Sequence, residues 1–255
     1  MGKFVRLSIT AVFFLSASAQ AAADELVVAV ASNFLPTAEL LKNRFESASV
    51  HRLRFSSGST GKLYAQIMNA APYDILLAAD AERPRLLEQH GRAVEGSRFT
   101  YALGQLAIYS RDPILAGPAC ARWQEFMGSR KLAIANPALA PYGVAAQQYL
   151  EGRGQWQAVQ SNLVMGENVS QALQFAVDGG ALLGFVAAAQ LRAPNLPEAT
   201  CAELLPPSTY AAIEQQAVLL KRAANREAAA AFISFLQSEA ARRLIVQAGY
   251  QVLAR

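Results

Sequence analysis

The segment FSSGSTGKLYAQI, residues Phe55 to Ile67, joins a predicted strand to a predicted helix. The strand is expected over Arg52–Phe55, and Leu63, Ile67 and Met68 recur at the spacing of one helix face. Small hydroxyl residues and glycines form the turn between them. Such a turn leaves backbone N–H groups unpaired at the start of the helix, where the helix dipole also favours negative charge. The segment therefore predicts an α/β unit with a candidate anion site at its turn.

This turn does not fit a nucleotide-binding P-loop. The motif G-x-x-x-x-G-K-[ST] requires a glycine where this chain has Ser56 and a hydroxyl residue where it has Leu63. Two interpretations of the turn stay open. Its backbone and hydroxyl groups bind an anion, or Ser59 or Thr60 only caps the helix.

Short apolar runs alternate with helical patterns along most of the chain. This alternation predicts an α/β fold with mainly parallel sheets flanked by helices. Residues 194–208 are Pro-rich and are expected to form a loop, and no flexible tether separates two domains. The predicted strands are Leu26–Ala31, Arg52–Phe55, Ile75–Ala78, Leu106–Tyr109, Leu132–Ala135, Leu183–Ala188 and Ala217–Leu220.

The N-terminal segment MGKFVRLSITAVFFLSASAQAAADE has the features of a secretory signal peptide. Lys3 and Arg6 precede an apolar core, and the alanines at 21–23 suit a cleavage site before Asp24. The apolar run is short for a membrane-spanning helix, which disfavours the alternative of an N-terminal anchor. We expect residues 1–23 to be removed during export.

Composition and net charge exclude few functions. Removal of Lys3 and Arg6 takes two positive charges from the formal +4, and the remainder is too small to predict binding to nucleic acid or to a membrane. The chain has 255 residues, of which 53% are hydrophobic, so it can form one large domain or two lobes with packed cores.

The two cysteines, Cys120 and Cys201, lie in the part of the chain that we expect to be exported. An oxidising compartment favours a disulfide between them, and two buried free thiols are the open alternative. His51 and His90 lie elsewhere, without the spacing of metal ligands. We expect both histidines at the surface and no site for a bare metal cation.

Four predicted strand-to-helix turns carry neutral hydrogen-bond donors. In open α/β folds, ligands gather at the carboxyl ends of strands, where helices begin. Only Lys62 and Glu167 bring charge near these turns, and both are expected to point to solvent. Neutral donors can hold a dianion if every ligand oxygen meets one, although each turn alone also suits an ordinary helix start. The turns contain Ser32 and Asn33, then Ser59 and Thr60, then Asn136 to Gly143, and last Asn168, a predicted N-cap, with Gln171 three residues on.

No set of catalytic residues can be assembled from the sequence. The nucleophile-elbow motif G-x-S-x-G is absent, and two histidines in unrelated contexts give little basis for a triad. Asp74 and Asp80 lie beside a predicted strand without a partner motif. An exported α/β hydrolase or transferase is therefore the less favoured alternative.

Long segments of the chain resemble the periplasmic molybdate-binding proteins, which are the substrate-binding components of molybdate ABC transporters. The resemblance runs from about Leu26 to Leu253. The segments that carry it are VAVASNFLPT, SSGSTGKLYAQI with NAAPYDILLAAD, GSRFTYALGQLAIYS, IANPALAPYG, LGFVAAAQ and AGY.

This resemblance implies a two-lobed binding protein that closes on a tetrahedral oxyanion. Residues 24–103 and 217–255 would form one lobe and residues 104–216 the other, with crossings near Gly104 and Gln216. It further implies a periplasmic protein without enzymatic activity or cofactor. We expect a monomer that delivers molybdate, or tungstate, to the membrane permease of an ABC transporter.

The resemblance also assigns ligand-binding residues at the four turns. Backbone N–H groups would act at the third and fourth turns. The assigned residues are Ser32, Asn33, Thr60 with the adjacent Ser59, Tyr142 and Val169. The chain departs from the family pattern at Ala187, where some members have a tyrosine whose hydroxyl reaches the anion. The ring or hydroxyl of Tyr142 is a candidate replacement.

A site built only from donors predicts which oxyanions it accepts. Molybdate, tungstate and sulfate are fully deprotonated near neutral pH, whereas phosphate carries a proton that would meet no acceptor, at a cost of about 1–3 kcal/mol. Discrimination against sulfate must then depend on cavity size, and little discrimination is expected between molybdate and tungstate. A sulfate-binding protein is the alternative within the same class.

Overall fold

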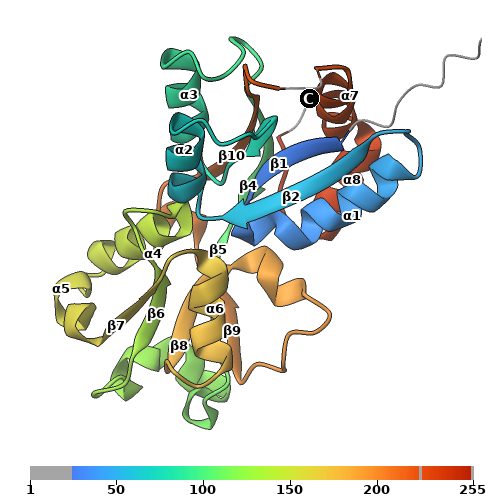
Figure 1. The fold of residues 1–255 in the computed structure, drawn as a ribbon. Helices are drawn as coiled ribbons and strands as arrows, with labels where there is room; N and C mark the ends of the chain where they lie inside the picture. The colour runs from blue at the N-terminus through green and yellow to red at the C-terminus, as the bar shows by residue number, and fades with distance from the viewer. Residues whose placement is uncertain (1–24, 224–225, 254–255) are drawn as a thin grey trace, which may run out of the picture.

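The computed structural model describes residues 25–223 and 226–253, and they form two lobes, each built on a five-stranded sheet (Figure 1). The predicted signal peptide, residues 1–23, lies outside the described residues. Within the described ranges, no helix has both the length and the apolar character needed to cross a membrane.

The first lobe contains the sheet β2-β1-β3-β10-β4. Its inner strand β1, which pairs with β2 and β3, alternates between two cores: Val28 and Val30 join the cluster under α1, α7 and α8, and Ala29 joins the cluster under α2 and α3. Burial on both faces explains its nearly continuous apolar sequence. The strands are β1 Glu25–Ala31, β2 Arg52–Gly58, β3 Ile75–Leu77, β4 Phe99–Gly104 and β10 Ile213–Leu219.

The second lobe contains the sheet β7-β6-β8-β5-β9. The helix α4 and the 3₁₀ segment η3 cover one face through Tyr149 and Trp123, and α6 covers the other through Ala172 and Ala176. The strands are β5 Leu106–Ser110, β6 Leu132–Ala135, β7 Leu163–Gly166, β8 Leu183–Ala187 and β9 Cys201–Leu204.

Helices connect the strands and flank both sheets (Figure 1). The α-helices are α1 Leu35–Glu46, α2 Thr60–Met68, α3 Glu82–Gln89, α4 Pro141–Gly152, α5 Trp156–Val159, α6 Val169–Val177, α7 Arg226–Leu236 and α8 Glu239–Gln247. The 3₁₀ segments are η1 Ser32–Phe34, η2 Pro113–Leu115, η3 Gly117–Phe126, η4 Gln160–Asn162, η5 Ala188–Arg192 and η6 Pro207–Thr209.

The predicted α/β architecture with two lobes is present, but both sheets are mixed rather than mainly parallel. In the first sheet β10 runs antiparallel to β3 and β4, and in the second β5 runs antiparallel to β8 and β9. The strands β4, β7 and β9 were not predicted, and β9 lies inside the segment 194–208 that was expected to be a loop. Strand β9 is a short edge strand with the sequence CAEL, whose last three residues are exposed, so it lacks the apolar run on which the prediction depended.

The chain passes between the lobes in ordered strands. Strand β4 ends at Gly104 and β5 begins at Leu106 in the other sheet. The chain returns in β10, whose first residue Ile213 pairs with Gly104. Strand β10 thus enters the first sheet a few residues before the predicted boundary at Gln216.

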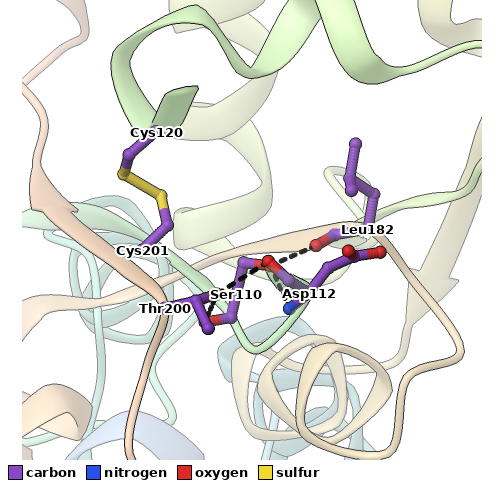
Figure 2. Close-up of a disulfide and its surroundings, with 6 residues drawn as sticks. All are labelled: Ser110, Asp112, Cys120, Leu182, Thr200 and Cys201. Carbon is purple, nitrogen blue, oxygen red and sulfur yellow. Dashed lines mark hydrogen bonds between the residues drawn. A yellow bond between two sulfur atoms is a disulfide. The ribbon is translucent and has the colours of Figure 1, made fainter. Parts of the chain in front are cut away.

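A disulfide joins Cys120 of η3 to Cys201 at the start of β9, across 81 residues of sequence (Figure 2). Beside it, the side chain of Thr200 donates to the carbonyl oxygens of Ser110 and Asp112 at 3.2 and 2.9 Å. The Ser110 hydroxyl donates to the carbonyl of Leu182 at 2.6 Å. These contacts fix the far end of the second lobe.

Candidate functional site

Strand register places the four predicted turns at the carboxyl ends of strands, two turns in each lobe. Ala31 pairs with Gly58 at the carboxyl ends of β1 and β2, so the turns that follow them are neighbours in the first lobe. Ala135 pairs with Gly166 at the ends of β6 and β7, which places the other two turns together in the second lobe. Carboxyl ends of parallel strands are where open α/β folds bind ligands.

The four turns enclose one small cavity between the lobes, with a volume of about 10 Å³. This is about the room that one water molecule needs. All six residues assigned from the sequence line it, and no charged side chain does. The lining residues are Ala31, Ser32, Asn33, Gly58, Ser59, Thr60, Ala79, Ala140, Pro141, Tyr142, Asn168 and Val169.

Ser59 and Thr60 present hydroxyl groups at the start of α2. Ser59 occupies the N-cap position, but its side chain makes no capping hydrogen bond. The residue is 3% exposed, and its Oγ has no hydrogen-bond partner among the described residues. The Oγ1 of Thr60 accepts a hydrogen bond from the backbone N–H of Ala79 at 3.0 Å, which leaves its own proton free to donate. Helix capping therefore does not account for Ser59.

Asn33 lies in η1, directly after β1, and its side-chain amide donates hydrogen bonds within the protein. Its Nδ2 donates to Gln215 Oε1 at 2.9 Å and to the Tyr250 hydroxyl at 3.1 Å. Both amide hydrogens are thus used. Ser32 and Asn33 retain first-turn backbone N–H groups, which lack partners within the helix.

The second lobe offers backbone donors at the starts of α4 and α6. Helix α4 begins with Pro141, has no side-chain cap, and places Tyr142 in its first turn. At α6, Asn168 caps the N–H groups of Ser170 and Gln171 at 3.0 and 3.2 Å, as the sequence predicted. This cap does not engage the N–H of Val169, the first residue of the helix.

The hydroxyl of Tyr142 joins a buried network that spans the crossing strands. It accepts a hydrogen bond from Gln215 Nε2 at 3.4 Å. The Tyr101 hydroxyl lies 3.3 Å from Gln215 Oε1, and the Tyr250 hydroxyl donates to the carbonyl of Asn33 at 2.8 Å. Burial raises the pKa of Tyr101, Tyr142 and Tyr250 above 10, so all three stay neutral. Gln215 was not singled out in the sequence, where it is one of two glutamines in a strand and carries no motif.

Charged residues lie near the cavity in sequence but are not among the residues that line it. Lys62 and Glu167 lie at the surface as expected, but they form an ion pair across the two lobes at 3.1 Å. Asp80 follows the cavity residue Ala79, and its carboxylate accepts from the backbone and guanidinium of Arg83. Burial raises the pKa of Asp80 while the contacts with Arg83 oppose that rise.

Ala187 lies at the end of β8, fully buried, and does not line the cavity. Its backbone N–H donates to the Gln190 side chain at 2.9 Å. In the described part of the chain, no group of His, Cys, Asp and Glu residues is arranged to hold a metal ion. The arrangement is suited to a small anion that accepts hydrogen bonds from neutral groups.

Comparison with known proteins gives consistent matches over nearly the whole chain. The model of the bacterial extracellular solute-binding protein family matches residues 26–251. The molybdate-binding protein ModA of Rhodobacter capsulatus is 37% identical over 90% of this chain and 89% of its own length. The molybdate-binding protein ModA of Azotobacter vinelandii is 39% identical over 92% of both chains. The solved periplasmic molybdate-binding protein of Azotobacter vinelandii superposes with a TM-score of 0.82 at 38% identity, covering 90% of this chain and all of that one.

Proposed function

The chain belongs to the family of bacterial extracellular solute-binding proteins, and we propose that the solute it carries is molybdate. The relatives also confirm the resemblance to periplasmic molybdate-binding proteins that the sequence segments indicate. The chain is thus a binding protein rather than an enzyme. Molybdate is the cargo in this function, and no cofactor takes part.

The observation that carries the proposal is the hydroxyl of Ser59. A buried polar group without a partner costs about 1–3 kcal/mol, so native proteins rarely keep one without a reason. Ser59 lies on the wall of a cavity that Thr60, Tyr142 and Val169 also line, the last two from the first turns of α4 and α6. An oxyanion would satisfy these donors from both lobes at once.

Entry of the anion requires the lobes to move apart. A cavity with room for about one water molecule is too small for a tetrahedral oxyanion to enter as the walls stand. A two-lobed protein that opens and closes around its crossing strands provides that movement. Because donors come from both lobes, bound anion favours the closed form.

Selectivity follows from the donor set. With no carboxylate on the cavity wall, a protonated phosphate would lack an acceptor for its O–H, whereas molybdate, tungstate and sulfate need only donors. Tungstate is expected to bind as molybdate does. Rejection of sulfate depends on the size of the closed cavity.

We assign the role of an additional donor to the hydroxyl of Tyr142. Gln215 Nε2 donates to this oxygen, so the phenolic proton is free to point at the anion. This donor would stand in for the tyrosine that is replaced by Ala187. The neutral state of Tyr142, which burial enforces, is the state in which it can donate.

The proposed place of the protein is the periplasm, where it would act as a monomer. The N-terminal segment and the periplasmic molybdate-binding relative from Azotobacter vinelandii support this location. Delivery to the permease of an ABC importer is what the resemblance to the substrate-binding components of molybdate ABC transporters implies. The closed form of the two lobes is the form that such a permease would recognise.

Titration calorimetry of the chain from Asp24 onward tests the proposal. We expect binding of molybdate and tungstate, weaker or absent binding of sulfate, and none of phosphate. Ser59→Ala should weaken molybdate binding roughly 10- to 100-fold, because a hydrogen bond to a charged group contributes about 1.5–3 kcal/mol. The same change should leave the melting temperature of the ligand-free protein unchanged or higher, since it removes a buried hydroxyl that has no partner in residues 25–223 and 226–253.

Ser56→Ala is the matched control. Ser56 lies on β2, the strand that leads into Ser59, but its hydroxyl is hydrogen-bonded to the Tyr73 hydroxyl at 2.9 Å, and Ser56 does not line the cavity. Its loss should lower stability slightly and leave affinity unchanged. Sulfate binding as tight as that of molybdate would favour the alternative of a sulfate-binding protein, and absence of binding by all four anions would refute the proposal.

A further inference from the structure

The lobes touch beside the cavity through a residue that does not line it. The backbone N–H of Gly61 donates to the carbonyl oxygen of Leu139 at 2.9 Å. Gly61 follows Thr60 in the first turn of α2, and Leu139 precedes Ala140 on the other lobe. The contact thus joins two walls of the cavity directly beside the proposed anion.

Close approach of the second lobe is what excludes a side chain at Gly61. A Cβ added there would lie 2.9 Å from the carbonyl oxygen of Leu139 and 3.2 Å from its Cα. Both atoms belong to the backbone, so neither can rotate away as the end of a side chain could. Separation of the lobes would remove the conflict.

The helix itself gives no reason for glycine at this position. Gly61 is not among the glycines with positive φ, so its backbone conformation is open to any residue. In a helix, alanine is favoured over glycine because glycine loses more conformational freedom on folding. The requirement for glycine therefore arises from the closed arrangement of the lobes.

The neighbouring ion pair adds little to this contact. Lys62 and Glu167 also join the lobes, but their side chains are 50% and 54% exposed. Exposed pairs of this kind contribute weakly and are screened by salt. The backbone contact of Gly61 is the tighter constraint on closure.

We propose that Gly61 determines the affinity of the protein for its anion without touching the anion. Its missing side chain admits Leu139, and its N–H closes the hydrogen bond that exists only when the lobes meet. A substitution that changes the free energy of the closed form alone shifts the equilibrium between the open and closed forms. The apparent affinity for the anion then changes with it. This inference rests on the proposed function, because the affinity in question is that for molybdate.

Gly61→Ala separates this role from a role in folding. We expect molybdate to bind roughly tenfold more weakly or worse, since the hydrogen bond is strained or lost and closure is hindered. The melting temperature without ligand should be unchanged or higher, because alanine favours the helix. In small-angle X-ray scattering at saturating molybdate, the variant should keep a larger radius of gyration than the parent.

Gly152→Ala provides the control. Gly152 lies in the last turn of α4, and an added Cβ there would meet nothing within 4 Å. This variant should bind molybdate with the affinity of the parent. Parent affinity in Gly61→Ala, or a fall of its ligand-free melting temperature, would overturn the inference. Failure of the parent protein itself to bind molybdate would instead refute the proposed function, so the two failures are distinct.

Discussion

Asn33 and Ser59 follow neighbouring strands of one sheet, yet their polar groups have different partners. The amide hydrogens of Asn33 go to Gln215 and Tyr250, whereas the hydroxyl of Ser59 has no partner among the described residues. Asn33 therefore fixes the shape of the wall, and Ser59 is the group that a ligand would satisfy. Residue type and position predicted that both would line the site, but only the contacts with distant Gln215 distinguish their roles.

Tyr142→Phe tests the hydroxyl network at the same scale. Burial holds the pKa of Tyr142 well above 10 in the folded protein, while an unfolded tyrosine loses its proton near pH 10. The contribution of the neutral Tyr142 hydroxyl to the free energy of unfolding is thus complete below pH 10. It is lost as pH rises further, because the unfolded state then binds fewer protons than the folded state. Above pH 10 the unfolding free energy of the parent should fall with pH more steeply than that of Tyr142→Phe. The difference in slope should approach about 1.4 kcal/mol per pH unit, the contribution of one hydroxyl.

Denaturant unfolding of parent and variant between pH 9 and 11 measures the difference in slope. Molybdate titration of the same variant at neutral pH should show weaker binding if the hydroxyl donates to the anion. Parallel stability curves would contradict the burial of the hydroxyl, and unchanged affinity would contradict its assignment as a donor.

At the scale of elements, strands with continuous apolar sequences were predictable and edge strands were not. The predicted range Leu132–Ala135 matches β6, which is buried throughout. Strand β10 was predicted to begin too late in the chain, because its first half, IEQQ, is polar. The side chains of Gln215 and Gln216 form hydrogen bonds inside the crossing region, which the sequence pattern does not reveal. The cap at Asn168 was predictable because capping is local, whereas the pairing partners of a strand depend on the whole lobe.

The disulfide is the covalent link between elements of the second lobe. It joins η3 to β9 across a separation of 81 residues, for which loop-closure entropy in the unfolded chain corresponds to about 4–5 kcal/mol. Urea unfolding with and without a thiol reductant should show a marked loss of stability on reduction. The double variant Cys120→Ala with Cys201→Ala should be insensitive to reductant. A parent midpoint that reductant does not change would contradict a stabilising role for this link.

At the scale of the whole molecule, two lobes meet at a cavity of neutral donors, and their ordered crossing strands pair at Gly104 and Ile213. The strand-to-helix pattern of the sequence predicted the four turns, and the resemblance of long sequence segments predicted the two lobes. It did not predict the contact between Gly61 and Leu139, because contacts between lobes depend on how two separately folded units approach each other. Sequence periodicity predicts the strands and helices within each lobe, but it does not predict which residues of the two lobes come into contact.

A crystal structure of the chain from Asp24 onward with molybdate, measured at the molybdenum absorption edge, tests the central claim most directly. Anomalous scattering locates the metal atom without assumptions about the ligand. The account predicts one strong peak between the lobes, with oxygens bonded to the Ser59 hydroxyl and to the backbone N–H groups of Tyr142 and Val169. A peak elsewhere on the molecule, or no peak at saturating molybdate, would contradict it.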